Sequence, residues 1–450
     1  MPAIVSAWAP AALRPYLTRP ALAAFLFGIS SGFPYALLAA TLTQWLSEAG
    51  VERKTVAIFS WVLFTYNLKV LWAPLIDRVP IPWLTARLGQ RRSWLLVISI
   101  LLTAAIWNLA LQDPNADLSA FAWSAILVGI CGASLDIVID AYRIELLKAN
   151  EQGVGAAVSQ YGWRMGTLIA ANIVLGVAAV YGWSAGYIAT SSVVLFGLVA
   201  GFWIGEPSRP PASDPGAQDQ TREQAPLARL WGSLQLTMVA PFADFFLRVG
   251  AWAVLLFILL HKIGDTLANL MLRNMLVALE FTKDEIRWAD VNFGMACLFL
   301  GIFVGGVIYA RWGVKRAVML GLILMMVSNL SFAALAQAGH SVLGLAATMG
   351  FENFASGMGG VAVVGYLSLL CNQKFTATQF AMLSAAASVL GRFLTGAFAG
   401  GLIDDYGYTN FYLITTLAAL PGVLMFAYLW RRGWVQESAS GEDLAQERSP

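Results

Sequence analysis

Residues 134–147 read SLDIVIDAYRIELL and end a long apolar run that begins near Phe121. A run of this length is typical of a membrane-spanning helix. Its second half nevertheless holds four charged residues, Asp136, Asp140, Arg143 and Glu145. A charge inside a bilayer costs at least about 2.5–3.5 kcal/mol on insertion scales, so such a residue usually faces a cavity on an ion or substrate path. We therefore expect this helix to line a polar cavity.

Asp136 is the first candidate for a proton-binding group. Asp140 follows it by four residues and Arg143 follows Asp140 by three, so the three side chains share one face of the helix. Asp140, a turn nearer the helix end, is the second candidate for proton coupling. The alternative is a static, ion-paired strut near the cytoplasmic end of the helix.

The composition is that of a polytopic membrane protein. Of the 450 residues, 58% are hydrophobic and 12% are charged, whereas a soluble protein carries roughly 25% charged residues. The mean hydropathy is +0.68. The formal net charge of +2 gives no sign of nucleic-acid binding. The three cysteines and two histidines lack metal-ligand spacing, so we expect no metal and no cofactor.

We expect an all-α fold with twelve membrane-spanning helices in two pseudo-symmetric six-helix bundles. The bundles occupy residues 1–204 and 249–435. A polar, proline-rich cytoplasmic linker over 205–248 joins them, with an amphipathic helix expected in its second part. Residues 436–450 form a polar tail that we expect to be disordered. The expected spans are 20–42, 55–77, 93–112, 121–147, 153–181, 184–204, 249–275, 288–310, 315–337, 341–371, 377–401 and 409–430.

The distribution of basic residues orients these spans. If both termini are cytoplasmic, the cytoplasmic segments hold 19 Lys and Arg residues and the opposite side holds five. Cytoplasmic loops carry the excess of Lys and Arg in membrane proteins, so this topology is the one we expect. Four basic residues remain inside spans: Lys69, Arg164, Lys262 and Arg392.

Two of these cations match an acid in depth. Asp136 and Arg164 lie 14 residues before and after the turn near Asn150, which is about 21 Å at ~1.5 Å per residue. Glu352 and Arg392 lie 20 residues before and after the turn near Asn372, about 30 Å by the same rise. We expect each acid to pair with the arginine at its depth, and Glu352 is a third candidate for proton coupling.

Lys69 on the second span and Lys262 on the seventh complete the intramembrane cations. Lys262, Asp265 and Asn269 are spaced i, i+3 and i+7, so they share a helix face. Lys262 and Asp265 are candidate charge partners, either of one another or within the cavity, and Asn269 is a candidate substrate ligand.

Aromatic and amide residues supply the other candidate substrate contacts. The first span contains SSGFPY over residues 30–35, where Gly32 and Pro34 are expected to weaken the helix and free backbone carbonyls. Side chains able to stack on sugar rings or bond hydroxyl groups are Tyr66, Asn67, Tyr161, Trp163, Asn353 and Phe354. The alternative for each is ordinary packing.

Two cytoplasmic loops resemble each other and the loop motif of the major facilitator superfamily. The first reads DRVPIPWLTARLGQRRSW over residues 77–94, and the second reads YARWGVKRAV over 309–318. We expect Asp77 to latch onto a cation of a neighbouring helix, with Arg143 as the candidate partner. Arg78 and Arg311 are the other candidate gating residues. The alternative is that these arginines serve only topology.

Longer motifs make the chain resemble the muropeptide permease (AmpG) family, in the peptide, acetyl-CoA and drug transporter branch of the major facilitators. They cover most of both halves of the chain. These motifs are SGFPYALLAATLTQWL (31–46), NLKVLWAPLIDR (67–78), DIVIDAYR (136–143), LLHKIGDTLAN (259–269) and FENFASGMGGVAVVGYLSLLCNQKFTATQFAMLSA (351–385).

The resemblance implies proton-driven import of N-acetylglucosaminyl-1,6-anhydro-N-acetylmuramyl peptides from periplasm to cytoplasm, in peptidoglycan recycling linked to β-lactamase induction. By the same resemblance Asp136 is the matching acid. We expect a monomer in the bacterial inner membrane. A transporter of another solute, such as acetyl-CoA or a drug, is the alternative. An integral-membrane enzyme is disfavoured because the chain has no GxxxxGK[ST], HExxH or triad motif. A sensor that binds ligand without transport is a third alternative.

Overall fold

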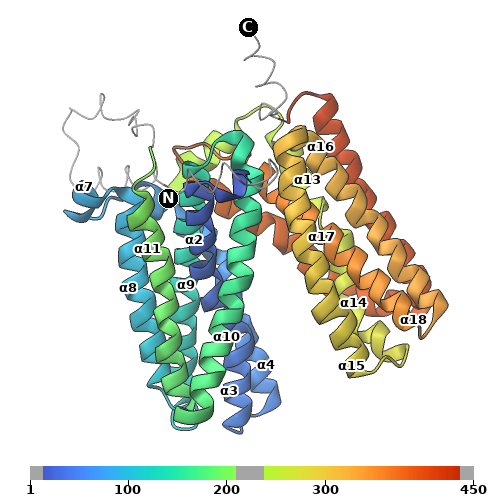
Figure 1. The fold of residues 1–450 in the computed structure, drawn as a ribbon, viewed down its shortest axis with the longest axis horizontal. Coiled ribbons are helices and arrows are strands. Elements are labelled where there is room, and N and C mark those ends of the chain that lie inside the picture. The colour runs from blue at the N-terminus through green and yellow to red at the C-terminus, as the bar shows by residue number, and fades with distance from the viewer. Residues whose placement is uncertain (1–13, 209–237, 436–450) are drawn as a thin grey trace. The chain divides into compact units, whose positions relative to one another are not determined.

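The computed structural model describes residues 14–208 and 238–435, without the side chains of residues 388–400 and of Ala40, Arg53, Ala57 and Ser60. All regular secondary structure in these two ranges is helical, which confirms the expected all-α class (Figure 1). Residues 209–237, most of the linker, and the polar tail lie outside the described residues. Of the expected amphipathic helix, residues 238–246 are described and are helical.

The helices of the first half include one continuous span and one broken span. The first span is formed by α2 (Arg19–Ala36), a π-helical turn η2 (Leu37–Thr41) and α3 (Leu42–Glu48). The second is divided into α4 (Arg53–Phe59), η3 (Ser60–Phe64), α5 (Thr65–Leu68), η4 (Lys69–Leu71) and α6 (Ala73–Arg78). The remainder are α7 (Leu84–Leu88), α8 (Gln90–Ala110), α9 (Leu118–Leu146), η5 (Ala149–Glu151), α10 (Gln152–Thr190), η6 (Ser191–Val193) and α11 (Val194–Ile204).

The second half contains longer continuous helices. They are α13 (Ala251–Leu260), α14 (Ile263–Ala278), α15 (Lys283–Ile286), η7 (Arg287–Gly294), α16 (Met295–Ala338), α17 (Val342–Leu370) and α18 (Thr376–Arg431).

Every one of the twelve expected spans is mainly helical. Within the described residues, eight helical stretches are long and apolar enough to cross a membrane, and two of them, Ala149–Ile204 and Lys283–Ala338, each contain two expected spans. The two expected spans outside these stretches are the broken second one and the eleventh, which runs into residues 388–400.

Glycines mark four equivalent turns between these helices. Gly89, Gly182, Gly313 and Gly407 have φ of 91°, 85°, 78° and 74° and ψ between 168° and 171°. A positive φ ends a helix at little cost only at glycine. The twelve expected spans can be divided in chain order into four groups of three. Each of these turns joins the second and third spans of one group, so the chain repeats the same three-helix pattern.

The chain divides into two compact units. Unit 1 comprises residues 1–148, 158–246 and 371–382, and unit 2 comprises residues 149–157, 247–370 and 383–450. The segment Cys371–Met382, which contains the first turn of α18, thus belongs with helices from the first half of the sequence. In unit 1, α2 packs against α9 and α11, and α8 packs against the same two helices (Figure 1).

Glycines also allow the close crossing of α2 and α10 in unit 1. An added Cβ at Gly32 would lie 2.2 Å from the carbonyl oxygen of Trp163, and one at Gly162 would lie 2.1 Å from that of Phe25. Gly28–Gly32 and Gly162–Gly166 both have the small-xxx-small spacing that lets membrane helices approach closely. This crossing fixes the backbone of residues 161–166 against the first span.

Candidate functional site

Asp136 lies at the centre of a polar network in unit 1. Its Oδ2 accepts a hydrogen bond from the ammonium group of Lys69 in η4, with which it forms an ion pair. Its Oδ1 accepts a 2.6 Å hydrogen bond from the hydroxyl of Ser31 in α2. The Lys69 side chain is 8% exposed, whereas the Asp136 side chain is 20% exposed. The network therefore joins the first, second and fourth spans and leaves the acid partly accessible.

The network continues along α9 with alternating charge. Lys69 Nζ lies 3.9 Å from Asp140 Oδ2, and Asp140 Oδ1 lies 3.6 Å from a guanidinium nitrogen of Arg143. The Arg143 guanidinium in turn lies 5.4 Å from the centre of the Phe380 ring in the first turns of α18. Asp136, Lys69, Asp140 and Arg143 thus form a neutral row in which each cation borders an acid.

The expected pairing of Asp136 with Arg164 is wrong. The partner of Asp136 is Lys69, and Arg164 forms no ion pair with any residue whose side chain is described. Its guanidinium lies over the ring of Trp163, with its central carbon 5.3 Å from the ring centroid. Equal depth on two helices does not fix their rotation, and the rotation of α9 turns Asp136 toward the second span.

Aromatic side chains lie beside this network. The Tyr35 ring lies 5.6 Å from the Tyr66 ring and 5.5 Å from the Trp163 ring. Tyr66 is three residues before Lys69, and Tyr35 is one helical turn after Ser31. Asn67 and Tyr161 are partly exposed. The four expected substrate contacts of the first half lie on two segments. Tyr66 and Asn67 are within residues 65–71, and Tyr161 and Trp163 are on α10.

A second polar cluster occupies unit 2. Glu352 of α17 accepts hydrogen bonds from Ser328 at 2.5 Å, from Asn269 at 3.1 Å and from Ser356 at 3.1 Å. Asn269 and Ser356 each also lie 3.3 Å from Asp265 Oδ1, so both donors bridge the two carboxyl groups. Glu352 and Asp265 are both buried. Two carboxyl groups that share a site cannot both be ionised without a large penalty.

Lys262 and Arg392 are the two cations expected to pair with the acids of this cluster. Lys262 is exposed, lies at the helix break between α13 and α14, and forms no ion pair among the described side chains. Arg392 lies outside the residues whose side chains are described, so its pairing with Glu352 stays a prediction.

Asn353 and Phe354 lie against a neighbouring helix of unit 2. The Asn353 amide donates a 2.9 Å hydrogen bond to the Met349 carbonyl of its own helix and lies close to Gly294 of η7. The Phe354 carbonyl meets Gly301 of α16, where an added Cβ would lie 2.2 Å away. Both residues are partly buried.

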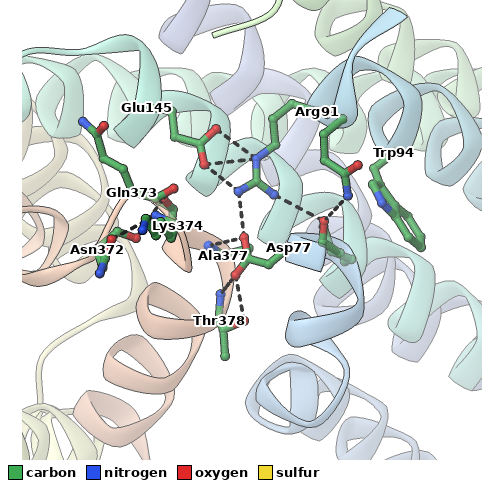
Figure 2. Close-up of polar contacts among 12 residues, drawn as sticks. Asp77, Arg91, Trp94, Glu145, Asn372, Gln373, Lys374, Ala377 and Thr378 are labelled. Atoms are coloured by element: carbon green, nitrogen blue, oxygen red, sulfur yellow. Dashed lines mark hydrogen bonds and ion pairs between the residues drawn. The ribbon is translucent and has the colours of Figure 1, made fainter. Parts of the chain in front are cut away.

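A buried network surrounds Asp77 at the end of the second span, as Figure 2 shows. Asp77 Oδ1 lies 2.7 Å from a guanidinium nitrogen of Arg91, which also lies 2.5 Å from Glu145. The Asp77 carboxylate also accepts hydrogen bonds from the backbone N–H groups of Ala377 and Thr378, at 3.1 and 2.7 Å, and from the Thr378 hydroxyl at 2.7 Å. The side chains of Asp77 and Arg91 have no exposed surface. An acid from α6 therefore caps the first turn of α18.

This network gives Asp77 a cation partner that the expected latch did not include. Asp77 forms an ion pair with Arg91, and Arg143 lies 3.6 Å from Asp140. The expected pairing of Asp77 with Arg143 stays a prediction. Arg78 lies over the Phe375 ring at 5.0 Å, just before α18. Arg311 is exposed and forms no ion pair within the described ranges, so its gating role stays a prediction.

Several functional candidates escaped the sequence analysis. Arg91 was counted only toward topology, and Glu145 was given no partner. Glu206, directly after α11, accepts hydrogen bonds from the backbone N–H groups of Arg91 and Arg92 at 2.7 and 3.0 Å and so caps α8. Asp244 accepts from Asn372 at 3.1 Å and from Gln379 at 2.8 Å. The two Glu206 contacts are those of a carboxylate at a helix N-terminus.

The fold and the charged groups within its spans define a class of protein. Residues 20–261 match the family model of the major facilitator superfamily. The structure superposes on the proton:xylose symporter XylE with a TM-score of 0.62 over 93% of this chain, at 14% identity, and on FucP with a TM-score of 0.61 over 92%, at 16% identity. The superpositions show the fold, and the family match shows that the chain is a multi-pass membrane transporter of the major facilitator superfamily.

Relatives narrow the assignment. The chain is 35% identical to the anhydromuropeptide permease of Escherichia coli (strain K12) over 401 residues, which cover 89% of this chain and 77% of that protein. It is 31% identical to a Rickettsia conorii protein that carries the name AmpG 4, over 90% of this chain and 95% of that protein. The chain therefore belongs to the AmpG-type permeases of the major facilitator superfamily.

Proposed function

We propose that this protein imports anhydromuropeptides, N-acetylglucosaminyl-1,6-anhydro-N-acetylmuramyl peptides, from the periplasm into the cytoplasm in symport with protons. The 35% identity to the Escherichia coli permease supports the substrate class. The observation that carries the coupling is the ion pair between Asp136 and Lys69 within the membrane-spanning helices. The cargo would feed peptidoglycan recycling and, through it, β-lactamase induction.

Proton binding at Asp136 would change the charge of its network. With Asp136 ionised, Lys69 is held by this acid and is 3.9 Å from Asp140. A proton on Asp136 removes that attraction, which frees Lys69 to move toward Asp140 and weakens the hold of Asp140 on Arg143. Because Arg143 contacts Phe380 of α18, this shift would reach the helix that Asp77 caps.

The Glu352 and Asp265 cluster is the second proton site in this proposal. Two bridging donors, Asn269 and Ser356, bring the carboxyl groups together. Electrostatic repulsion between two buried carboxylates favours one shared proton. Asn269 is exposed, so cargo that takes its hydrogen bonds would alter how tightly that proton is held.

Release of the Asp77 network would accompany alternating access. Major facilitator transporters rock their two halves around a central site, and the bonds from Asp77 to Ala377 and Thr378 join α6 to the start of α18. These bonds must break if the first turn of α18 moves away from α6. The excess of basic residues on one side supports cytoplasmic termini in a bacterial inner membrane, and we propose a monomer.

Uptake into liposomes tests the proposal. Purified protein is reconstituted and supplied with radiolabelled anhydromuropeptide under a pH gradient that is acid on the side of entry. We expect accumulation above the external concentration that a protonophore abolishes. Accumulation of acetyl-CoA or a cationic drug, with none of anhydromuropeptide, would contradict the proposed substrate, and binding without uptake would indicate a sensor.

A further inference from the structure

Arg164 is a cation within the membrane-spanning part of α10 whose charge is not balanced. It forms no ion pair with any described side chain, and the network of Asp136 is completed by Lys69. A guanidinium is effectively always charged, and a charge within a bilayer is costly unless it is paired or faces water. Arg164 is only partly buried and the described side chains supply no ion pair for it, so its guanidinium is available to an anion that enters along the transport path.

The position of Arg164 is fixed by packing. The carbonyl of Trp163 lies against Gly32, and Gly162 lies against the carbonyl of Phe25, so the backbone on the N-terminal side of Arg164 cannot shift without a clash. The guanidinium then lies over the Trp163 ring at 5.3 Å. A stacked arginine keeps the edge of its guanidinium plane available for a bidentate acceptor.

Arg164 also ends a continuous row of side chains. The row runs from Asp136 through Ser31 to Tyr35, one turn further along α2, and then to Trp163, whose ring is 5.5 Å from that of Tyr35. Tyr66 joins the row from the second span. Tyr35 and Tyr66 thus lie on the same spans as Ser31 and Lys69 of the Asp136 network, and they connect that network to Trp163 and Arg164 on α10.

We propose that Arg164 binds a carboxylate of the peptide part of the cargo, while Trp163 and Tyr35 contact its sugar part. This inference rests on the proposed function, because a peptide bears a carboxylate and a sugar ring presents an apolar face to aromatic side chains. Arg164 is then a specificity-determining residue, and it selects for cargo with an anionic peptide. A phospholipid phosphate is the other anion that reaches a membrane arginine.

The test compares two cargoes that differ only in charge. One is an anhydromuropeptide with free peptide carboxylates, and the other is the same compound with every carboxylate amidated. The variants are Arg164→Gln, Arg164→Lys and the matched control Arg287→Gln, whose guanidinium pairs with Asp284 and is 70% exposed. Uptake is measured in liposomes of phosphatidylcholine alone and in liposomes that also contain phosphatidylglycerol.

We expect wild-type protein and Arg287→Gln to take up the anionic cargo with a KM about tenfold lower than that of the amidated cargo. Arg164→Gln should raise the KM of the anionic cargo about tenfold and leave the KM of the amidated cargo unchanged. For the anionic cargo, the KM of Arg164→Lys should lie between those of the wild type and Arg164→Gln. The result should hold in both lipids. Equal losses for the two cargoes, or an effect confined to liposomes with phosphatidylglycerol, would overturn the inference and, in the second case, assign Arg164 to lipid.

A binding measurement separates this inference from the proposed function. Both cargoes are added to purified protein in detergent, and the shift in Tm is recorded for wild type and Arg164→Gln. Stabilisation by the anionic cargo that requires Arg164 supports the inference even if wild-type liposomes accumulate neither compound, a result that contradicts the proposed function alone. Stabilisation of equal size in Arg164→Gln contradicts the inference.

Discussion

Asp77 and Thr378 lie 301 residues apart in the chain, and the carboxylate of the first accepts hydrogen bonds from both the backbone N–H and the hydroxyl of the second. A carboxylate at a helix N-terminus satisfies N–H groups that have no partner within the helix and interacts favourably with the helix dipole. Asp77 meets both needs for α18 while it also pairs with Arg91. One side chain thus ties the end of the second expected span to the start of the eleventh.

Asp77→Asn should loosen the first turn of α18. The amide keeps the shape of the carboxylate but loses its charge, so its bonds to Arg91, Ala377 and Thr378 weaken together. We expect Cys371, a partly buried residue just before α18, to react faster with a membrane-impermeant maleimide applied from the cytoplasmic side. Cys297, on α16, is the internal control. An unchanged rate at Cys371 would show that Asp77 does not hold this turn.

Arg91→Met should destabilise the protein by about 3–5 kcal/mol, because it removes the guanidinium that pairs with the buried carboxylates of Asp77 and Glu145. The double variant Arg91→Met, Glu145→Gln should recover part of that loss, since one stranded charge is removed. Thermal unfolding in detergent measures both. If the double variant is no more stable than Arg91→Met, the ion pair with Glu145 contributes little.

Lys69→Met should destabilise the protein through a stranded charge on Asp136, whereas Asp136→Asn leaves Lys69 with Asp140 as its remaining acid. The double variant Lys69→Met, Asp136→Asn carries neither charge, so we expect it to be more stable than Lys69→Met by a few kcal/mol. The double variant Arg164→Met, Asp136→Asn should be no more stable than Arg164→Met, because Arg164 is not the ion-pair partner of Asp136. Additive losses in the first double variant would argue against the pair.

Gly32→Leu should prevent the close approach of α2 and α10. The added Cβ would lie 2.2 Å from the Trp163 carbonyl oxygen, a backbone atom that cannot move aside. We expect little folded protein, as judged by a monodisperse peak in size-exclusion chromatography. Gly176→Leu, at a glycine of α10 with no atom within 4 Å of its Cβ position, should fold normally. Equal yields of the two variants would contradict the packing argument.

Much of the fold could be predicted from the sequence because the bilayer imposes length and hydropathy on every span. The apolar runs place the helices, and Gly89 and Gly313 lie between expected spans, in the two loops that resemble each other. The breaks in the second span could not be predicted. Its 3₁₀ segments η3 and η4, the second of which begins at Lys69, pack against α9 and depend on that packing rather than on local propensity.

The candidate site could be predicted only in part. Charges inside spans identified Asp136, Lys69 and Glu352 as residues that need a partner, but the partner is chosen by helix rotation and by which helices are neighbours. Depth alone therefore matched Asp136 with Arg164 instead of Lys69. Arg91 was missed for a related reason: it lies in a loop rich in arginine, and nothing in its spacing distinguishes an arginine that is buried against Asp77 from one that is solvated.

Uptake by Asp136→Asn in liposomes tests the central claim most directly. Accumulation of anhydromuropeptide under an imposed pH gradient is compared with exchange of labelled for unlabelled cargo at equal pH on both sides. We predict that the variant loses gradient-driven accumulation and keeps exchange, because the cargo path remains while the proton site is lost. Accumulation equal to that of the wild-type protein would contradict the assignment of Asp136 as the coupling residue.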